Sequence, residues 1–545
     1  MAKESGKKPT LFAREATGLV REAGFWDTVV YNILPLAPGI ILAYQLFWIP
    51  GTFPGGSIVG AMIMACVLAI CIATPYGLLS MAMPRTSADY VATSRIIHPG
   101  IGLGSSLVLT WSSVLSAGYY GLAFTWWAVT PAVSVIGVST GNSGLVQWGA
   151  TLSTFPYNFI IGALGTILSC VVIAAGMRRL MIYQNILFIV GMIGMVIMAA
   201  ILITTPQSVF ITQFNQFALP YTKQADSYHY IIQQAAARGM QYPGTYTWPA
   251  TVSVLPAIMA SGMWTWFSVA QTGEVKGAAT RRHWYTMILA AVIQYAILIV
   301  MVLLIFNTIG EQFISSANFL YSTAPDVYAI PVAPMLPLLA GLIPGGIIIP
   351  CVIVLTFLTW TPLIDYIQLL QPVKALFAWS FDRILPEKVS DVNERTHSPL
   401  YAITICGLIG IGLFIWASAP GWGAGFFQLL IIAAVAGNVT ISITGITAIL
   451  FPYVKRDLYK ASAAKIEVLG IPLCVIAGVI TVLVQCFLAY MYLTDLRYGM
   501  TMPVQGAALN LGLLVVGVVI YYIAKAIRTR QGINLDYLFK EVPPE

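Results

Sequence analysis

Long apolar runs and short polar segments alternate along this chain, and the alternation predicts its elements. A membrane-spanning helix needs about 20 predominantly apolar residues, and twelve runs of roughly that length can be placed. The predicted helices lie near residues 26–48, 56–83, 101–133, 158–177, 182–204, 251–273, 285–309, 343–381, 400–418, 424–452, 466–492 and 503–525. The run at 343–381 is the least regular, because prolines interrupt it. The pattern therefore predicts an all-α integral membrane protein with about twelve transmembrane helices.

Two of these runs are broken at matching places in the two halves of the chain. The breaking residues are Pro35, Pro38 and Gly39 in the first run, and Pro256, Ser261 and Gly262 in the sixth. Proline and glycine at the centre of a membrane helix free backbone groups that hydrocarbon cannot solvate, so such breaks persist where these groups line a cavity. Two breaks at corresponding positions indicate the substrate site of a carrier.

The same breaks predict how the chain is organised. Helices 1–5 and 6–10 each open with a broken helix, and an odd number of spans per half gives the halves opposite topology. This predicts a 5+5 inverted repeat with two extra helices. The segments are an N-terminal cytoplasmic tail (1–25), a first repeat (26–204), an extracellular loop (205–250), a second repeat (251–452), helices 11 and 12 (453–525) and a C-terminal cytoplasmic tail (526–545). We expect the extracellular loop to cap the outer entrance.

Composition and charge support a membrane location. Only 9% of the residues are charged, against about 25% in soluble domains. Of the 27 Lys and Arg residues, all but Lys223, Arg238 and Arg497 fall in the tails and the even-numbered loops. This bias predicts a multi-pass protein of the cell membrane with both termini in the cytoplasm. The net charge of +7 is therefore expected to meet anionic lipid headgroups rather than nucleic acid.

Several classes of function are disfavoured by what the sequence lacks. All seven cysteines lie in apolar runs, which argues against a disulfide framework or a spaced metal cluster. The four histidines lie in loops or at helix ends, so no nucleophile–His–acid arrangement can be assembled within the membrane, and an enzyme is not expected. No phosphate-binding loop of the Gly-x-x-x-x-Gly-Lys-Ser/Thr type occurs, which argues against ATP as the energy source. We expect no cofactor other than Na⁺ or H⁺ as a coupling ion.

Short motifs at the predicted cytoplasmic helix ends follow a recognisable order. They are Leu19–Asp27, Met83–Val91 with Arg95, Gly273–Lys276, Lys374–Pro386 with Val392–Pro399, and Phe451–Tyr453. Together they resemble the motifs of amino acid–polyamine–organocation (APC) permeases over about residues 19 to 460. The chain departs from that pattern at four places: Pro38-Gly39-Ile40 stands for a Gly-x-Gly break, Ser87-Ala88 for Gly-Gly, Ser261-Gly-Met-Trp-Thr-Trp266 for the aromatic-Gly run of helix 6, and Lys374 for Arg. These departures leave the substrate open.

The resemblance implies a fold, a mechanism and a place for the substrate. The implied fold is a twelve-helix permease of the leucine-transporter type, in which substrate sits between broken helices 1 and 6 and access alternates. The expected function is secondary active transport of amino acids or related amines, coupled to an ion or working by exchange. A nutrient sensor that does not transport and a channel-like pore are the alternatives on the same fold.

Candidate substrate-binding residues follow from the groups that a dehydrated amino acid must satisfy. Pro35 and Pro38 leave the carbonyls of Tyr31 and Leu34 without helical donors, so these carbonyls are candidates for the ammonium. Free amides at the breaks suit the carboxylate. A polar face of helix 3 and aromatic residues after the second break complete the set, although each of these also fits packing. The predicted residues are Tyr31, Leu34, Pro38, Gly39, Ile40, Ser116, Tyr120, Ser261, Gly262, Trp264 and Trp266.

Charged residues within or next to the helices have separate roles. Asp365 stands alone in helix 8, and a carboxylate at membrane depth is functional by default. It could hold Na⁺ with Thr359 or Thr361, take a proton or pair with a cationic substrate; a shallow, solvated carboxylate is the alternative. Helix 5 contains no lysine, so coupling through a lysine there is disfavoured. At helix ends, Asp27, Glu274 and Asp382 are expected to pair with loop residues such as Arg85 and Arg383.

Overall fold

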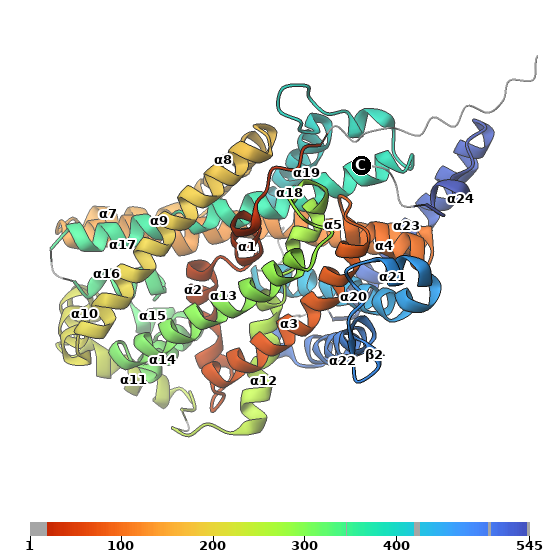
Figure 1. Cartoon of the computed structure of the whole chain (residues 1–545). Helices are drawn as coiled ribbons and strands as arrows, with labels where there is room; N and C mark the ends of the chain where they lie inside the picture. Colours follow the sequence, from red (N-terminus) through yellow and green to blue (C-terminus); the bar gives the residue numbers. More distant parts are fainter. Residues whose placement is uncertain (1–18, 243, 345, 419–425, 500–502, 542–545) are drawn as a thin grey trace, which may run out of the picture.

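The computed structural model describes residues 19–242, 244–344, 346–418, 426–499 and 503–541, and nearly all of them are helical (Figure 1). The described strands are β1 (Glu467–Val468) and β2 (Ile471–Pro472), which pair antiparallel in the connection before α22 (Leu473–Thr494). The molecule is therefore a helical bundle, and its architecture depends on where the long helices lie.

Eleven described spans are long and apolar enough to cross a membrane. They are formed by α1 (Phe25–Ile33) with α2 (Pro38–Thr52), α3 (Ile58–Ala82), α5 (Pro99–Phe124) with the π-helix η1 (Thr125–Val129) and α6 (Thr130–Ser139), α8 (Tyr157–Ala174), α9 (Met177–Thr204), α12 (Trp248–Gly262) with the 3-10 helix η2 (Phe267–Glu274), α13 (Arg281–Thr308), α17 (Ile348–Phe357) with α18 (Trp360–Phe381), α20 (Phe426–Val454), α22, and α23 (Pro503–Arg530). A further apolar helix, α19 (Leu400–Ser418), is shorter in its described part. Each of the twelve predicted runs therefore corresponds to a helix.

Short helices connect the spans on both sides. They are α4 (Ala88–Ile96), α7 (Ser143–Leu152), α10 (Gln207–Thr222), α11 (Ser227–Ala237), α14 (Glu311–Thr323), α15 (Pro325–Tyr328), α16 (Leu336–Leu342), η3 (Glu387–Ser390), α21 (Arg456–Ala461), η4 (Leu496–Tyr498) and α24 (Leu535–Leu538). The predicted 205–250 loop thus contains two helices. Phe313 of α14 joins them, because its ring lies 4.7 Å from that of Phe214 in α10 and stacks at 4.4 Å on Tyr228 of α11.

The break in the first span is built by prolines. Helix α1 ends at Ile33 and α2 begins at Pro38, and neither Pro35 nor Pro38 has an N–H to continue the helical ladder. Between them Ala37 takes a left-handed conformation with φ 37°. The span therefore consists of two half-helices joined by an irregular turn, as the sequence predicts.

The sixth and eighth spans are also interrupted. Helix α12 ends at Gly262, and the chain resumes as a 3-10 helix at Phe267, so the break lies where it was predicted. In the eighth span, α17 ends at Phe357 and α18 begins at Trp360. This accounts for the irregular run that prolines mark at 343–381.

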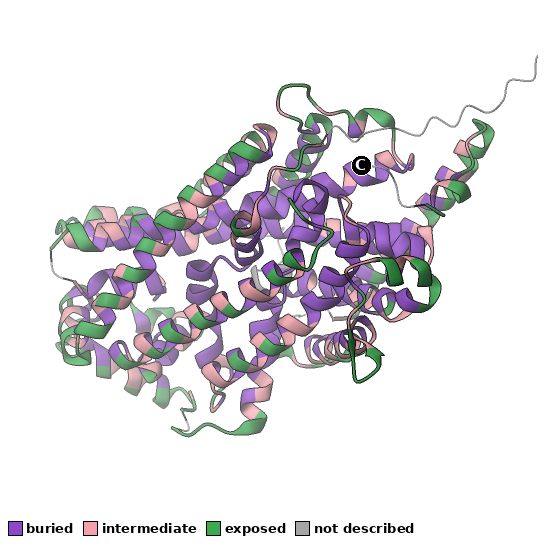
Figure 2. Ribbon diagram, in the orientation of Figure 1, coloured by how far each residue is buried: buried purple, intermediate pink, exposed green. Residues whose placement is uncertain are grey.

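The broken helices lie inside the bundle rather than in contact with lipid. Within the first and sixth spans, 94% and 89% of the most apolar window is buried, against 28% for α8 and α9 and 22% for α23. Figure 2 shows this contrast, with long exposed stretches along α8 and α9 and a buried centre. Freed backbone groups at the breaks are therefore enclosed by protein, as membrane proteins require.

Candidate functional site

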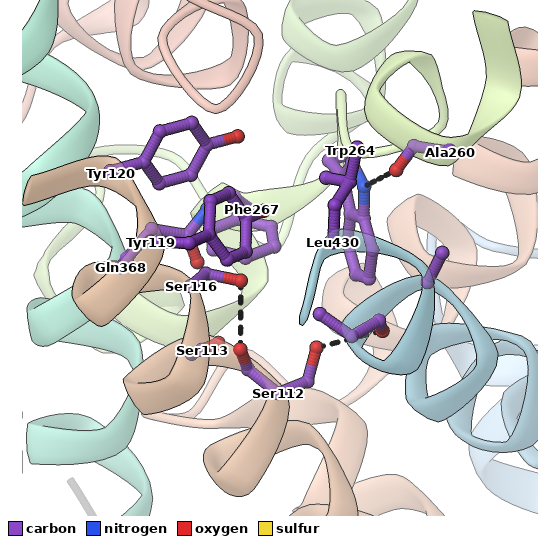
Figure 3. Close-up of a pocket in the computed structure, with 12 residues that line it drawn as sticks. Ser112, Ser113, Ser116, Tyr119, Tyr120, Ala260, Trp264, Phe267, Gln368 and Leu430 are labelled. Carbon is purple, nitrogen blue, oxygen red and sulfur yellow. Dashed lines mark hydrogen bonds between the residues drawn. The ribbon is translucent and has the colours of Figure 1, made fainter. Parts of the chain in front are cut away.

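A small cavity lies where four helices of the bundle meet (Figure 3). Its walls come from the third, sixth, eighth and tenth spans and consist of Ser112, Ser113, Ser116, Tyr119, Tyr120, Ala260, Trp264, Phe267, Gln368, Leu430, Ala433 and Ala434. Its volume is about 10 Å³, which is the space of roughly one water molecule. The structure therefore shows this central cavity closed down, too small for an amino acid.

The wall from α5 is a ladder of hydroxyl groups. The Ser112 hydroxyl donates to the carbonyl of Ala433 in α20 at 2.9 Å, and Ser116 donates to the Ser112 carbonyl at 2.8 Å. One turn further on, the rings of Tyr119 and Tyr120 lie 4.5 Å apart. The predicted polar face of helix 3 therefore lines the cavity, and Ser116 and Tyr120 lie where the sequence places them.

The wall from the sixth span is aromatic. The Trp264 indole N–H donates to the Ala260 carbonyl at 3.1 Å across the break, which holds the ring over the cavity. Phe267 meets Trp264 edge to face at 5.7 Å. On the other side of the ring lies Gly437 of α20, where a Cβ would come within 2.4 Å of the indole. Glycine at this position is therefore what allows α20 to approach Trp264.

Gln368 supplies the wall from α18 and is the one described amide side chain of the cavity. It is 5% exposed, and no hydrogen bond to its side-chain amide is described, as is also true of the Ser113 hydroxyl. In Figure 3 the amide lies beside Tyr119 and Ser116. The cavity thus contains a donor and an acceptor on one side chain.

The residues predicted at the first break do not line this cavity. Tyr31, Leu34 and Ile40 are fully buried, and the Leu34 carbonyl accepts a hydrogen bond from the Ala37 N–H at 2.9 Å. Pro38 and Gly39 are buried as well, at the start of α2.

A tryptophan fills the space beside this break. The indole of Trp360, in α18, lies so close to Gly39 that a Cβ there would come within 2.5 Å of the ring. The same indole would meet a Cβ at Gly191 of α9 at 2.7 Å. In this state the predicted first-helix site is therefore occupied by protein.

At the second break, three of the four predicted residues are engaged with neighbouring helices. The Ser261 hydroxyl accepts from the Gln45 amide at 3.4 Å, and the Gly262 carbonyl accepts from the Tyr295 hydroxyl at 3.0 Å. Trp266 stacks on Tyr76 of α3 at 3.7 Å with an interplanar angle of 8°. Trp264 alone of the four lines the cavity.

Asp365 is buried between helices instead of being solvated. It is 5% exposed, and its Oδ2 accepts from the Ser169 hydroxyl of α8 at 2.7 Å, while Oδ1 has no partner among the described residues. The Thr359 hydroxyl donates to the Thr356 carbonyl, and that of Thr361 is buried without a partner in the described chain. No hydrogen bond among the described residues joins either threonine to Asp365, and Asp365 does not line the central cavity.

Two buried ion pairs tie the helices together at the end of the bundle that the described segments near Glu22 and Glu541 contact, which we call the tail side. Lys374 of α18 pairs with Glu274 at the end of η2, and both side chains are about 4% exposed. Arg95 of α4 donates to both oxygens of Asp382 at 2.7 Å, and the Tyr90 hydroxyl donates to the same carboxylate at 2.8 Å. Glu274 and Asp382 are therefore paired with basic residues, as expected, and the described partners are Lys374 and Arg95.

Backbone contacts close the same side. The N–H groups of Glu22 and Ala23 both donate to the Glu274 carbonyl at 3.0 Å, and Lys276 N–H donates to the Ala23 carbonyl at 2.9 Å. The segment before α1 is thus bonded to the segment after η2. Together with the Lys374–Glu274 pair, these bonds close the bundle on the tail side, and we call this set of contacts the tail-side gate.

A buried histidine adds a polar link that the sequence did not predict, although His283 lies at a helix end as expected. His283, in the first turn of α13, meets the Ser80 hydroxyl at 3.2 Å and the Ser268 hydroxyl at 3.0 Å. The Ser268 N–H donates to the side-chain oxygen of Asn32 in α1 at 2.9 Å. Four spans are therefore bonded through one cluster close to the tail-side gate.

The main omission of the sequence analysis is Gln368, together with the cavity residues of α20. Gln368 follows Asp365 by three residues, which puts it on the next turn of the same helix. An uncharged polar residue inside an apolar run was a signal that could have found it. Leu430, Ala433 and Ala434 carry no such signal, because small apolar residues are ordinary in a membrane helix.

Comparison with known proteins identifies a family and a fold for this architecture. The model of the amino acid permease family matches residues 29–519. No curated protein matches the chain. The crystal structure of MhsT in complex with L-phenylalanine is similar in fold, with a TM-score of 0.54 and 15% sequence identity over 85% of this chain and 98% of that chain. This likeness confirms the leucine-transporter type of fold implied by the sequence motifs.

Proposed function

This chain belongs to the amino acid permease family, a family of transporters and not of enzymes, and we propose that it is a secondary active transporter working by alternating access. Its proposed substrates are amino acids or related amines, and its proposed location is the cell membrane with both termini in the cytoplasm. The observation that carries the proposal is the pair of half-helix breaks, both enclosed by protein, with the second one opening onto the central cavity.

The breaks provide the groups that an amino acid needs. The N-terminus of α2 presents the positive end of a helix dipole, which favours a carboxylate, and a proline-interrupted turn leaves carbonyls that suit an ammonium. In the closed state these groups are covered by Trp360 and Tyr295, since both touch glycines of the breaks. We propose that substrate replaces these contacts when the cavity opens.

The two ends of the bundle differ in a way that supports alternating access. The tail side is closed by ion pairs and backbone bonds. Toward the other side, a second cavity of about 190 Å³ lies between α2, η1, α7 and α14, with Phe47, Trp127 and Tyr321 among its walls. Tyr44 of α2 lies 5.5 Å from Trp127 and so stands at the edge of this outer cavity. These features support the proposal of a state in which the gate on the cytoplasmic side is shut.

Asp365 remains the proposed coupling residue. A buried carboxylate with one oxygen unpartnered in the described chain can gain a proton or a cation, whereas a solvated one would gain little. Its Ser169 contact joins α18 to α8, so a change in its charge would alter packing between these spans. Whether the partner is Na⁺ or H⁺, or whether the cycle is an exchange, is decided by the gradients that drive uptake.

Purified protein in liposomes tests the function. Labelled amino acids should enter, saturate with concentration, and be accelerated by the unlabelled compound trapped inside. Ser116→Trp should abolish this uptake, since it fills the central cavity, while Val196→Trp on the lipid-exposed face of α9 should not. Binding without uptake would favour a sensor, and uptake without saturation would favour a pore. Absence of uptake across amino acids and polyamines would refute the proposal.

A further inference from the structure

Among the described polar side chains that line the central cavity, Gln368 is the one that carries an amide, and no hydrogen bond to that amide is described. Ser112 and Ser116 donate their hydroxyls to carbonyls, and the Trp264 N–H is bound as well. Gln368 is 5% exposed and lines the cavity, so its amide is available to a ligand there. A ligand that filled the cavity without pairing this amide would leave it buried and unsatisfied, at a cost of about 1–3 kcal/mol.

Charge is the second observation. None of the twelve described residues that line the cavity carries a charge. The nearest carboxylate along the chain, Asp365, is held by Ser169 outside the lining, and Glu274 is neutralised by Lys374. A substrate side chain with a charge would therefore enter a closed cavity without a counter-ion, and burying an unpaired charge is far more costly than burying a polar group.

From these two observations we infer that Gln368 forms a hydrogen bond with the substrate's side chain and that the site selects amino acids with uncharged, hydrogen-bonding side chains. This inference rests on the proposed function and names its substrate class. An amide is both donor and acceptor, so it can pair with a hydroxyl or with another amide.

The remaining walls set the size and shape of the bound side chain. Tyr119, Phe267 and Trp264 are rigid rings that pack against the carbon atoms of a short side chain. An apolar side chain of the same size fits this space but leaves the Gln368 amide unpaired. A site with a buried hydrogen-bonding group rejects analogues that lack the matching group. Selection against apolar amino acids therefore comes from the unpaired amide, and selection against charged ones comes from the absence of a counter-ion among the described lining residues.

Two substitutions at Gln368 change its chemistry in opposite directions. Gln368→Glu keeps the shape and adds a negative charge facing the cavity. The binding affinity for lysine and arginine should therefore rise at least about tenfold relative to that for asparagine, glutamine, serine and threonine. Gln368→Leu removes the hydrogen-bonding group, so the binding affinity for leucine should rise at least about tenfold relative to that for the same four amino acids. Gln371→Glu is the matched control, since it adds the same charge one turn away at a residue that does not line the cavity.

The measurement is a binding panel on purified full-length protein, read by thermal stabilisation, with competition for uptake in liposomes as a second readout. The inference is supported if the wild type prefers the uncharged polar group and both substitutions shift the ratios as stated while Gln371→Glu does not. It is overturned if the wild type prefers charged or apolar amino acids, or if folded Gln368 variants keep wild-type ratios. Preferential binding without uptake would refute the proposed transport and leave this inference standing. If Gln368→Glu fails to fold, Gln368→Leu alone decides.

Discussion

Replacing Lys374 by methionine should open the tail-side gate. The substitution keeps most of the apolar stem and removes the charge that faces Glu274. In the closed gate Glu274 would then be a buried carboxylate without its cation. Opening exposes the same carboxylate to water, so the substitution penalises the closed state more than the open one.

The magnitude follows from the burial of the pair. Both side chains are about 4% exposed, and removing one partner of a buried ion pair costs about 3–5 kcal/mol. With about 1.4 kcal/mol for each factor of ten, the equilibrium between closed and open gate should shift by roughly two to three and a half orders of magnitude. The double substitution Lys374→Met with Glu274→Gln leaves no charge of this pair buried, so it should return the equilibrium most of the way to the closed gate.

Cysteine labelling measures the gate. Ala270 lies in η2 on the buried side of the gate, and its carbonyl accepts from the Ser87 N–H at 3.0 Å. In a background without the native cysteines, Ala270→Cys should react slowly with a membrane-impermeant maleimide applied from the cytoplasmic side. Adding Lys374→Met should raise the labelling rate by at least about tenfold, and the double substitution should lower it again.

Two results would refute the reasoning. Unchanged labelling in folded Lys374→Met protein would mean that the ion pair does not hold the gate. Equal labelling of the single and double variants would mean that loss of packing, and not the unpaired carboxylate, opens it.

Three further predictions follow from single residues. Asp365→Asn keeps the side-chain shape that Ser169 contacts and removes the charge, so gradient-driven accumulation should fall about tenfold more than exchange in liposomes; equal loss of both would exclude coupling. Gly262→Ala places a Cβ 2.2 Å from the Tyr295 hydroxyl, so it should lower the free energy of unfolding by about 1–3 kcal/mol. Adding Tyr295→Phe in the same chain should restore most of this loss, and wild-type stability in the alanine variant would contradict the prediction. Burial raises the pKa of Asp89, in the connection before α5, from 3.8 to about 6. Because the folded state binds that proton more tightly than the unfolded state, stability should decline as pH rises from about 4 to about 6, and Asp89→Asn should flatten the decline in unfolding measurements; an unaltered slope would refute the assignment.

The sequence by itself determined the membrane architecture. Hydrocarbon offers backbone groups no hydrogen-bond partners, so each span must be helical and apolar over its own length, which is a local property. For the same reason Pro35 and Pro38, and the small residues before Trp264, predicted both breaks correctly. Order along the chain was also enough to recognise the family.

Only the tertiary structure decided which residues meet. Arg95 and Asp382 are separated by 287 positions, and no periodicity selects Asp382 over another carboxylate. The central cavity takes its walls from four spans, so Gln368 became a site residue only once α18 was seen beside α5. At the first break, the indole of Trp360 fills the space that the sequence assigned to substrate, and Gly191 of α9 leaves room for that indole. Contacts between helices depend on how side chains of distant segments fit together. The sequence of one membrane helix indicates that the helix is buried, but it does not indicate which helices it packs against.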